Sequence, residues 1–216
     1  MPASDDLKSW LELQSATLDR VHPSWFPRIE PKLILAARRN PFGRRWLANN
    51  LARLGASLFC LAEWRPDAAD RLAPVAWLKQ PLEEPMECAL ELGGVALAAA
   101  LRTVVTRDGV MKLRLALGAP RYDRVLQFQS SADERPQWMS ESVEEVADHV
   151  ARRGAMELAG YTENAHPVWG ESVRLSFPRD WWSESPAQWT LPAATIEAAL
   201  RPADTLYEVV LTGTDA

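Results

Sequence analysis

Cysteine, histidine and lysine are scarce in this chain of 216 residues. It has two cysteines, Cys60 and Cys88, three histidines and four lysines. Two cysteines cannot build a disulfide framework, which favours a reducing compartment. No apolar run reaches the roughly 18 residues of a transmembrane helix, and residues 1–6 lack the basic and apolar regions of a signal peptide. We therefore expect a cytoplasmic protein without direct membrane insertion.

Sequence motifs that mark common catalytic and cofactor sites are also missing. The chain contains no phosphate-binding or dinucleotide-binding glycine pattern, no G-x-S-x-G, no C-x-x-C and no H-E-x-x-H. Its histidines, His22, His149 and His166, are far apart in the sequence. Cys88 follows Glu87, and a neighbouring carboxylate raises a thiol pKa rather than activating the thiol. The sequence thus predicts no catalytic residue, no metal and no cofactor, and a protein that is not an enzyme.

Hydrophobic periodicity predicts a mainly helical fold. Leu47, Leu51, Leu54, Leu58 and Leu61 step by four and three residues, which places them on one helix face. The same pattern, with proline, glycine and capping signals, predicts further helices. We expect them at 7–18, 31–39 (with Pro31 in its first turn), 67–78, 83–105 (with Pro85 near its start), 110–117 (ended by Gly118), 142–158 (begun by a capping box of Ser142 and Glu145 and ended by Gly160) and 193–200. Residues 121–129 fit either a helix or a strand, and Asn40 to Gly43 reads as a turn.

Near the C-terminus, prolines and tryptophans become frequent and short strands are expected at 172–177 and 206–211. The predicted fold is one domain of about six or seven helices over residues 1–162. A Pro/Trp-rich segment with a small β element, residues 163–216, is expected to pack on it. Gly93 and Gly94, followed by four alanines, predict a close helix–helix crossing, because small residues let two backbones approach.

Charge is distributed unevenly along the chain, whose net charge is −5. Residues 20–53 contain eight basic residues and one acidic residue, whereas residues 133–216 are strongly acidic. Such polarity can orient a partner or be neutralised within the fold. Arginine and tryptophan are common anchors of protein interfaces. The candidate partner-binding residues are Arg38, Arg39, Arg44, Arg45, Trp181 and Trp182.

The arginine cluster 38–45 is also the best candidate for binding nucleic acid. It is short, contains a single aromatic residue, Phe42, and belongs to an acidic chain. A partner-facing or solvated turn fits these features better, so no nucleic-acid partner is expected.

The middle of the chain resembles a known family. The relevant residues are Leu92-Gly93-Gly94-Val95-Ala96-Leu97, Leu101-Arg102, Leu113-Arg114-x-x-Leu117-Gly118 and Tyr122. Further similarity lies at His22-Pro23-Ser24-Trp25, around Gly154, and at Arg174-Leu175-Ser176-Phe177-Pro178. Over residues 20–180 this order is similar to the YscK/SctK family, the cytosolic accessory proteins of bacterial type III secretion injectisomes, and in particular to its Hrp-type branch.

The resemblance implies a non-enzymatic adaptor of the sorting platform, at the cytosolic face of the inner membrane. Family members link the cytoplasmic domain of the inner-membrane ring protein to the pod protein and so to the ATPase complex. No catalytic residue is carried over. Two alternatives remain open: a small helical enzyme or ligand-binding protein with an unrecognised site, and a secretion chaperone.

Overall fold

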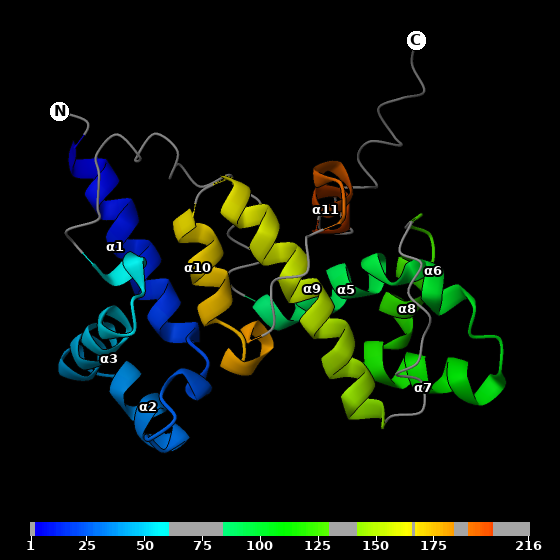
Figure 1. Ribbon diagram of the computed structural model, residues 1–216, viewed down its shortest axis with the longest axis horizontal. Helices are drawn as coiled ribbons and strands as arrows, with labels where there is room; N and C mark the ends of the chain where they lie inside the picture. The colour runs from blue at the N-terminus through cyan, green and yellow to red at the C-terminus, as the bar shows by residue number, and fades with distance from the viewer. Residues whose placement is uncertain (1–2, 61–83, 130–141, 166, 184–189, 201–216) are drawn as a thin grey trace, which may run out of the picture.

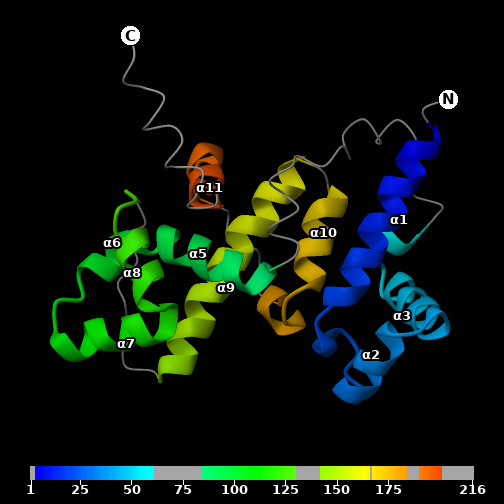
Figure 2. The ribbon, with the colours of Figure 1, turned by 180° about the vertical axis from the view of Figure 1, so that it is seen from behind.

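The computed structural model describes residues 3–60, 84–129, 142–165, 167–183 and 190–200. Within these ranges the chain forms ten α-helices and no strand. The helices spread along the long axis of the molecule, with α1 to α3 at one end and α6 to α8 at the other (Figures 1 and 2). The long helix α9 crosses α5 between these ends. None of the described helices combines the length and apolar character needed to span a membrane.

The N-terminal end, residues 3–60, contains five helical segments, three of which begin with a proline. Pro23, Pro31 and Pro41 each occupy a first helical position, where the missing N–H costs nothing. The Asn40 side chain accepts a hydrogen bond from the Gly43 N–H, 2.7 Å, and so caps α3. The elements are α1 (Ala3–Arg20), η1 (Pro23–Trp25), α2 (Pro31–Arg38), α3 (Pro41–Arg53) and η2 (Ser57–Phe59).

Helix α5 (Pro85–Ala96), which crosses α9, leads into the opposite end of the molecule. That end contains α6 (Ala98–Arg102), α7 (Arg107–Leu117) and α8 (Ala119–Val125) (Figure 1). Leu97 leaves helical geometry and separates α5 from α6. The Thr106 side chain caps α7, and Gly118, at φ +81°, ends it as the sequence predicts. Residues 119–125 are helical, which resolves the choice left open for 121–129.

The remaining helices are α9 (Val143–Ala165), α10 (Pro167–Leu175), the 3-10 turn η7 (Arg179–Trp182) and α11 (Ala193–Leu200). The predicted capping box is confirmed at the start of α9. The Ser142 N–H donates to the Glu145 carboxylate, 2.8 Å, and the Glu145 N–H donates to Ser142 Oγ, 3.2 Å. Helix α11 confirms the helix expected at 193–200.

Helices α5 and α9 cross at two glycines, as the small residues of α5 predict. A Cβ at Gly93 would lie 1.8 Å from the Val150 carbonyl oxygen, and one at Gly154 would lie 1.8 Å from the Ala89 carbonyl oxygen. No side chain fits in either position, so the two backbones are in direct contact. Gly94 faces α8 in a similar way, since its Cβ would lie 2.9 Å from Val125 Cγ1.

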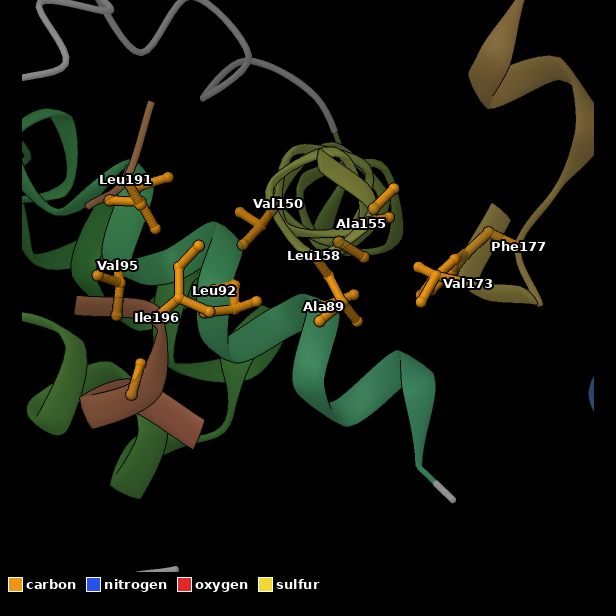
Figure 3. Close-up of a cluster of buried hydrophobic side chains, with 14 of the residues drawn as sticks. Ala89, Leu92, Val95, Val150, Ala155, Leu158, Val173, Phe177, Leu191 and Ile196 are labelled. Carbon is orange, nitrogen blue, oxygen red and sulfur yellow. The ribbon is translucent and has the colours of Figure 1, made fainter. Parts of the chain in front are cut away.

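A main hydrophobic cluster surrounds this crossing. It combines side chains from α1, η2, η7 and each of the helices α5 to α11. Figure 3 shows Ile196 of α11 beside Leu92 of α5, and Val173 and Phe177 on the other side of α9. A second, N-terminal cluster consists of Leu18, Val21, Phe26, Ile34, Leu47, Leu51, Ala56 and Leu175.

The structure corrects several local predictions. Asn40 to Gly43 begins α3 rather than forming an isolated turn. The leucine helix ends at Arg53, because Gly55 adopts φ +89° and the Ala56 N–H bonds back to the Leu51 carbonyl, 3.0 Å. Leu54 is therefore half-exposed, and Leu58 is buried in η2 rather than on α3.

The remaining predictions concern the end of α9, the expected strands, the helix at 67–78 and the domain division. Helix α9 continues through Gly160 to Ala165 instead of ending there. The strand expected at 172–177 is wrong, because Val173 and Leu175 are buried residues of α10, so the small β element is not supported there. The helix expected at 67–78 and the strand at 206–211 lie outside the described residues. The division expected at residue 162 stays a prediction; that residue lies inside α9.

Candidate protein-binding surface

The four predicted arginines flank the junction between α2 and α3, and two of them point inward. Arg38 donates to the carbonyl of Val21. Arg44 forms an ion pair with Asp19 and donates to Ser15 Oγ, 2.7 Å, and to the Ser15 carbonyl, 2.8 Å. Burial lowers the pKa of Arg38, and Asp19 opposes that shift. Arg38 thereby joins α2 to Val21, the residue that follows α1, and Arg44 joins α3 to α1.

The other two arginines of the cluster, Arg39 and Arg45, are exposed. The cluster therefore divides into a structural pair and a surface pair, although the four residues are close in sequence. Only the surface pair is accessible to a partner.

The predicted tryptophan anchors lie largely inside the fold. Trp181 is 8% exposed and stacks on Phe177, with ring centroids 5.6 Å apart. Trp182 is half-buried and meets Phe177 edge-on at 6.4 Å. Both rings hold η7 against the main cluster, which leaves little of either ring for a partner.

A surface that the sequence analysis did not single out lies on α3. Phe42, Trp46, Asn49 and Arg53 recur at intervals of four, three and four residues, so they share one helix face. All four are exposed. Phe42 is 87% exposed and Trp46 41% exposed. We call these four residues, together with the adjacent Arg45, the α3 outer face.

The Trp46 ring is held in place by a buried aromatic neighbour. Its ring stacks on Phe26 at a centroid distance of 6.2 Å and an interplanar angle of 26°. Phe26 is itself buried in the N-terminal cluster. An aromatic ring fixed in this way loses little further conformational entropy when a partner covers it.

The charge around this surface is basic. Neither α2 nor α3 contains an acidic residue. Nearby, Glu30 pairs with Lys32 at 2.7 Å, and Asp19 pairs with Arg44. Besides Lys32, residues 21–53 present four exposed bases: Arg28, Arg39, Arg45 and Arg53. The α3 outer face thus joins exposed aromatic rings to exposed guanidinium groups.

A second exposed apolar group lies at the other end of the molecule. Val105 precedes α7, and Met111 and Leu115 follow on its outer side, opposite the buried Leu113 and Leu117. The two exposed groups are separated by the α5–α9 crossing (Figure 1).

The described ranges contain few residues suited to act as a nucleophile or to bind a metal. Burial and the neighbouring Glu84 raise the pKa of the Cys88 thiol to about 12, so this thiol stays protonated near neutral pH. Burial lowers the pKa of His22, whose ring bonds to Ser24 Oγ at 2.8 Å and helps cap η1. The described residues contain no group of three or more metal-ligating side chains. His166 lies outside them.

The comparisons with known proteins add no relative to this picture. No family model, no curated protein and no solved structure matches the chain.

Proposed function

We propose that this chain is a non-enzymatic adaptor that binds other proteins through the α3 outer face. The observation that carries the proposal is the exposure of Phe42 and Trp46 beside Arg45 and Arg53, on a helix whose opposite face is buried. Aromatic residues and arginine are enriched among the residues that dominate protein–protein affinity. Exposed apolar side chains grouped in this way mark interaction sites.

The arrangement of the whole molecule supports a linking role. The second exposed apolar group, Val105, Met111 and Leu115, lies at the far end from α3. The closely packed α5–α9 crossing between them provides a rigid spacer. Two separated surfaces on one body suit a protein that connects two partners.

The sequence resemblance suggests who these partners are. Its order of motifs resembles that of the sorting-platform accessory proteins of type III secretion, whose partners are the inner-membrane ring protein and the pod protein. We accordingly propose that this chain is cytosolic, binds those two proteins, and is held at the inner membrane through them.

The test is calorimetry of the full chain with the ring protein's cytoplasmic domain and with the pod protein at physiological salt. We expect both to bind. The double variant Phe42→Ala, Arg45→Ala should weaken one of the two complexes by about tenfold or more, the loss typical of interface anchors. Its melting temperature should stay near wild type, since both side chains are exposed.

The matched control is Met111→Ala, Leu115→Ala, which removes exposed apolar groups from the other end of the molecule. This variant should retain the partner that the α3 variant loses. Failure of the wild-type chain to bind either protein would overturn the proposed function.

A further inference from the structure

We propose that the α3 outer face binds an acidic amphipathic segment of a partner protein. This inference rests on the proposed function as a protein-binding adaptor and adds the chemistry of the partner. It concerns only α3 and the exposed residues around it.

Charge complementarity selects an acidic partner. The thirteen residues of α3 include three arginines and no acid, and the eight of α2 are likewise free of acids. Arg44 is satisfied by Asp19, whereas Arg45 and Arg53 are exposed. Exposed guanidinium groups hold carboxylates in planar, two-point contacts. A basic or neutral segment would leave this charge uncompensated.

The aromatic stripe adds an apolar requirement. Phe42 and Trp46 are neighbours at i and i+4, and Arg53 lies on the same face two turns beyond Trp46. From Phe42 to Arg53 the helix advances about 16 Å, or three turns. A partner segment of similar length must present apolar side chains opposite the rings and carboxylates opposite Arg45 and Arg53. An amphipathic acidic helix meets both conditions.

The charge of the whole molecule argues against polyanionic surfaces as the occupant. The chain carries 29 acidic residues and a net charge of −5. Extended nucleic acid or an anionic bilayer would meet that charge beyond the edge of α3, whereas a short peptide segment covers only the basic face.

The test uses the full chain and a fluorescent 15-residue helical peptide with leucines on one face and glutamates beside them. Anisotropy titrations should show saturable binding that weakens as salt is raised. Arg45→Glu with Arg53→Glu should reduce affinity by about tenfold or more. Phe42→Ala should also weaken binding, whereas Met111→Ala with Leu115→Ala, at the far end, should not.

A charge-swap experiment tests whether weaker binding by the Arg45→Glu, Arg53→Glu variant comes from its changed surface charge or from unfolding. The Arg45→Glu, Arg53→Glu chain should bind the same peptide with lysine in place of glutamate, and the wild-type chain should not. Restored binding of this kind requires a folded surface with the proposed orientation.

Three outcomes would overturn the inference. One is equal affinity for a scrambled acidic peptide, which lacks the apolar face. Another is tighter binding of a single-stranded oligonucleotide or of phosphatidylserine vesicles through the same residues. The third is no peptide binding at all.

The test separates this inference from the proposed function. If the ring or pod protein binds through the α3 outer face but the acidic peptide does not bind, the proposed function stands and the inference fails. If the acidic peptide binds while neither protein does, the inference stands and the proposed partners are wrong.

Discussion

Single residues define the contact between the two central helices. Gly93 and Gly154 each face the other helix's backbone so closely that a Cβ would lie 1.8 Å from a carbonyl oxygen. A backbone carbonyl in a helix cannot rotate away as a flexible side chain can. Alanine is the better helix former by about 1 kcal/mol, but here that gain is outweighed by the steric conflict.

We predict that Gly93→Ala and Gly154→Ala each lower the free energy of unfolding by about 2 kcal/mol or more, because the crossing must open to admit the methyl group. This corresponds to a fall in melting temperature of at least about 4 °C for a chain of this size. Thermal melts followed by circular dichroism measure it. Asp148→Ala, an exposed position of α9, is the control and should change stability by under about 0.5 kcal/mol. A stabilised Gly93→Ala chain would contradict the close crossing.

Individual residues also decide which of the predicted anchors reach the surface. Arg38 and Arg45 look equivalent in the sequence, yet Arg38 is half-buried against the Val21 carbonyl and Arg45 is exposed. Trp181 sits in the main cluster, whereas Trp46, not singled out from the sequence, is 41% exposed. Composition indicates which residue types favour an interface. It does not indicate whether a given side chain points into solvent or into the core.

At the scale of elements, a buried carboxylate of α9 holds the chain that leads into α11, and the Tyr161 hydroxyl donates a hydrogen bond of 2.8 Å to Glu197 of α11 itself. Glu157 of α9 is fully buried. It accepts hydrogen bonds from the Thr190 N–H, 2.8 Å, Thr190 Oγ1, 2.9 Å, and the Leu191 N–H, 3.0 Å, and pairs with Arg153 at 2.7 Å. These bonds hold the chain just before α11, and Leu191 and Ile196 then enter the main cluster.

We predict that Glu157→Gln releases α11 while α5 and α9 stay folded. The amide removes the charge and one acceptor oxygen, which leaves buried donors unsatisfied at a cost of about 1–3 kcal/mol. Hydrogen exchange should speed up across residues 190–200 and change little in α5. Glu144→Gln, exposed in the first turn of α9, is the matched control. Unchanged exchange at 190–200 in the Glu157 variant would show that the apolar contacts and the Tyr161–Glu197 hydrogen bond suffice to hold α11.

At the scale of the whole molecule, a polar seam joins the N-terminal helices to α10. The Glu171 carboxylate accepts from the Ser57 N–H and Oγ, both 2.9 Å, and from the Leu58 N–H, 2.6 Å. Thr17 and Ser172 share a hydrogen bond of 2.7 Å. The Trp25 indole donates to the Phe177 carbonyl at 3.0 Å. The joint also has an apolar part. Leu175 of α10 belongs to the N-terminal cluster, and Trp10, Leu13 and Leu58 of the N-terminal elements belong to the main cluster.

We predict that Glu171→Ala loosens α1 to α3 relative to the α5–α9 body. The change leaves the Ser57 and Leu58 N–H groups without their acceptor, and the cost should be about 1–3 kcal/mol. Hydrogen exchange should increase in α1 to α3 and η2, and the thermal transition should broaden. Glu163→Ala removes the half-exposed pair with Arg174 and should cost under about 1 kcal/mol. Equal loosening of α5 and α9 would mean that the two parts unfold as one unit.

Much of the local structure could be read from the sequence. The capping box Ser142 to Glu145, the Gly118 helix end, the prolines at helix starts and the small residues of the α5 crossing each act within a few residues. Their effects depend on backbone geometry that neighbouring residues impose. The mainly helical fold follows from these signals and from apolar spacing.

Other features needed contacts between distant segments. Val173, Leu175 and Phe177 alternate with polar residues as in a strand, but α10 lies between α9 and the N-terminal helices, so both sides of this segment meet apolar neighbours. The burial of Trp181, the buried Glu157 and the division of the arginine cluster likewise arise from partners far along the chain.

The sequence by itself determined, to within two residues, where α2, α5, α9 and α11 begin, and which residues are small enough for two backbones to touch, because those properties are local. Only the tertiary structure decided that Phe42 and Trp46 share an exposed face with Arg53. A helix has several sides, and the side that remains in solvent is the one that no other segment covers. For α3 that side is the one opposite Leu47 and Leu51, whose burial turns the aromatic and basic residues outward.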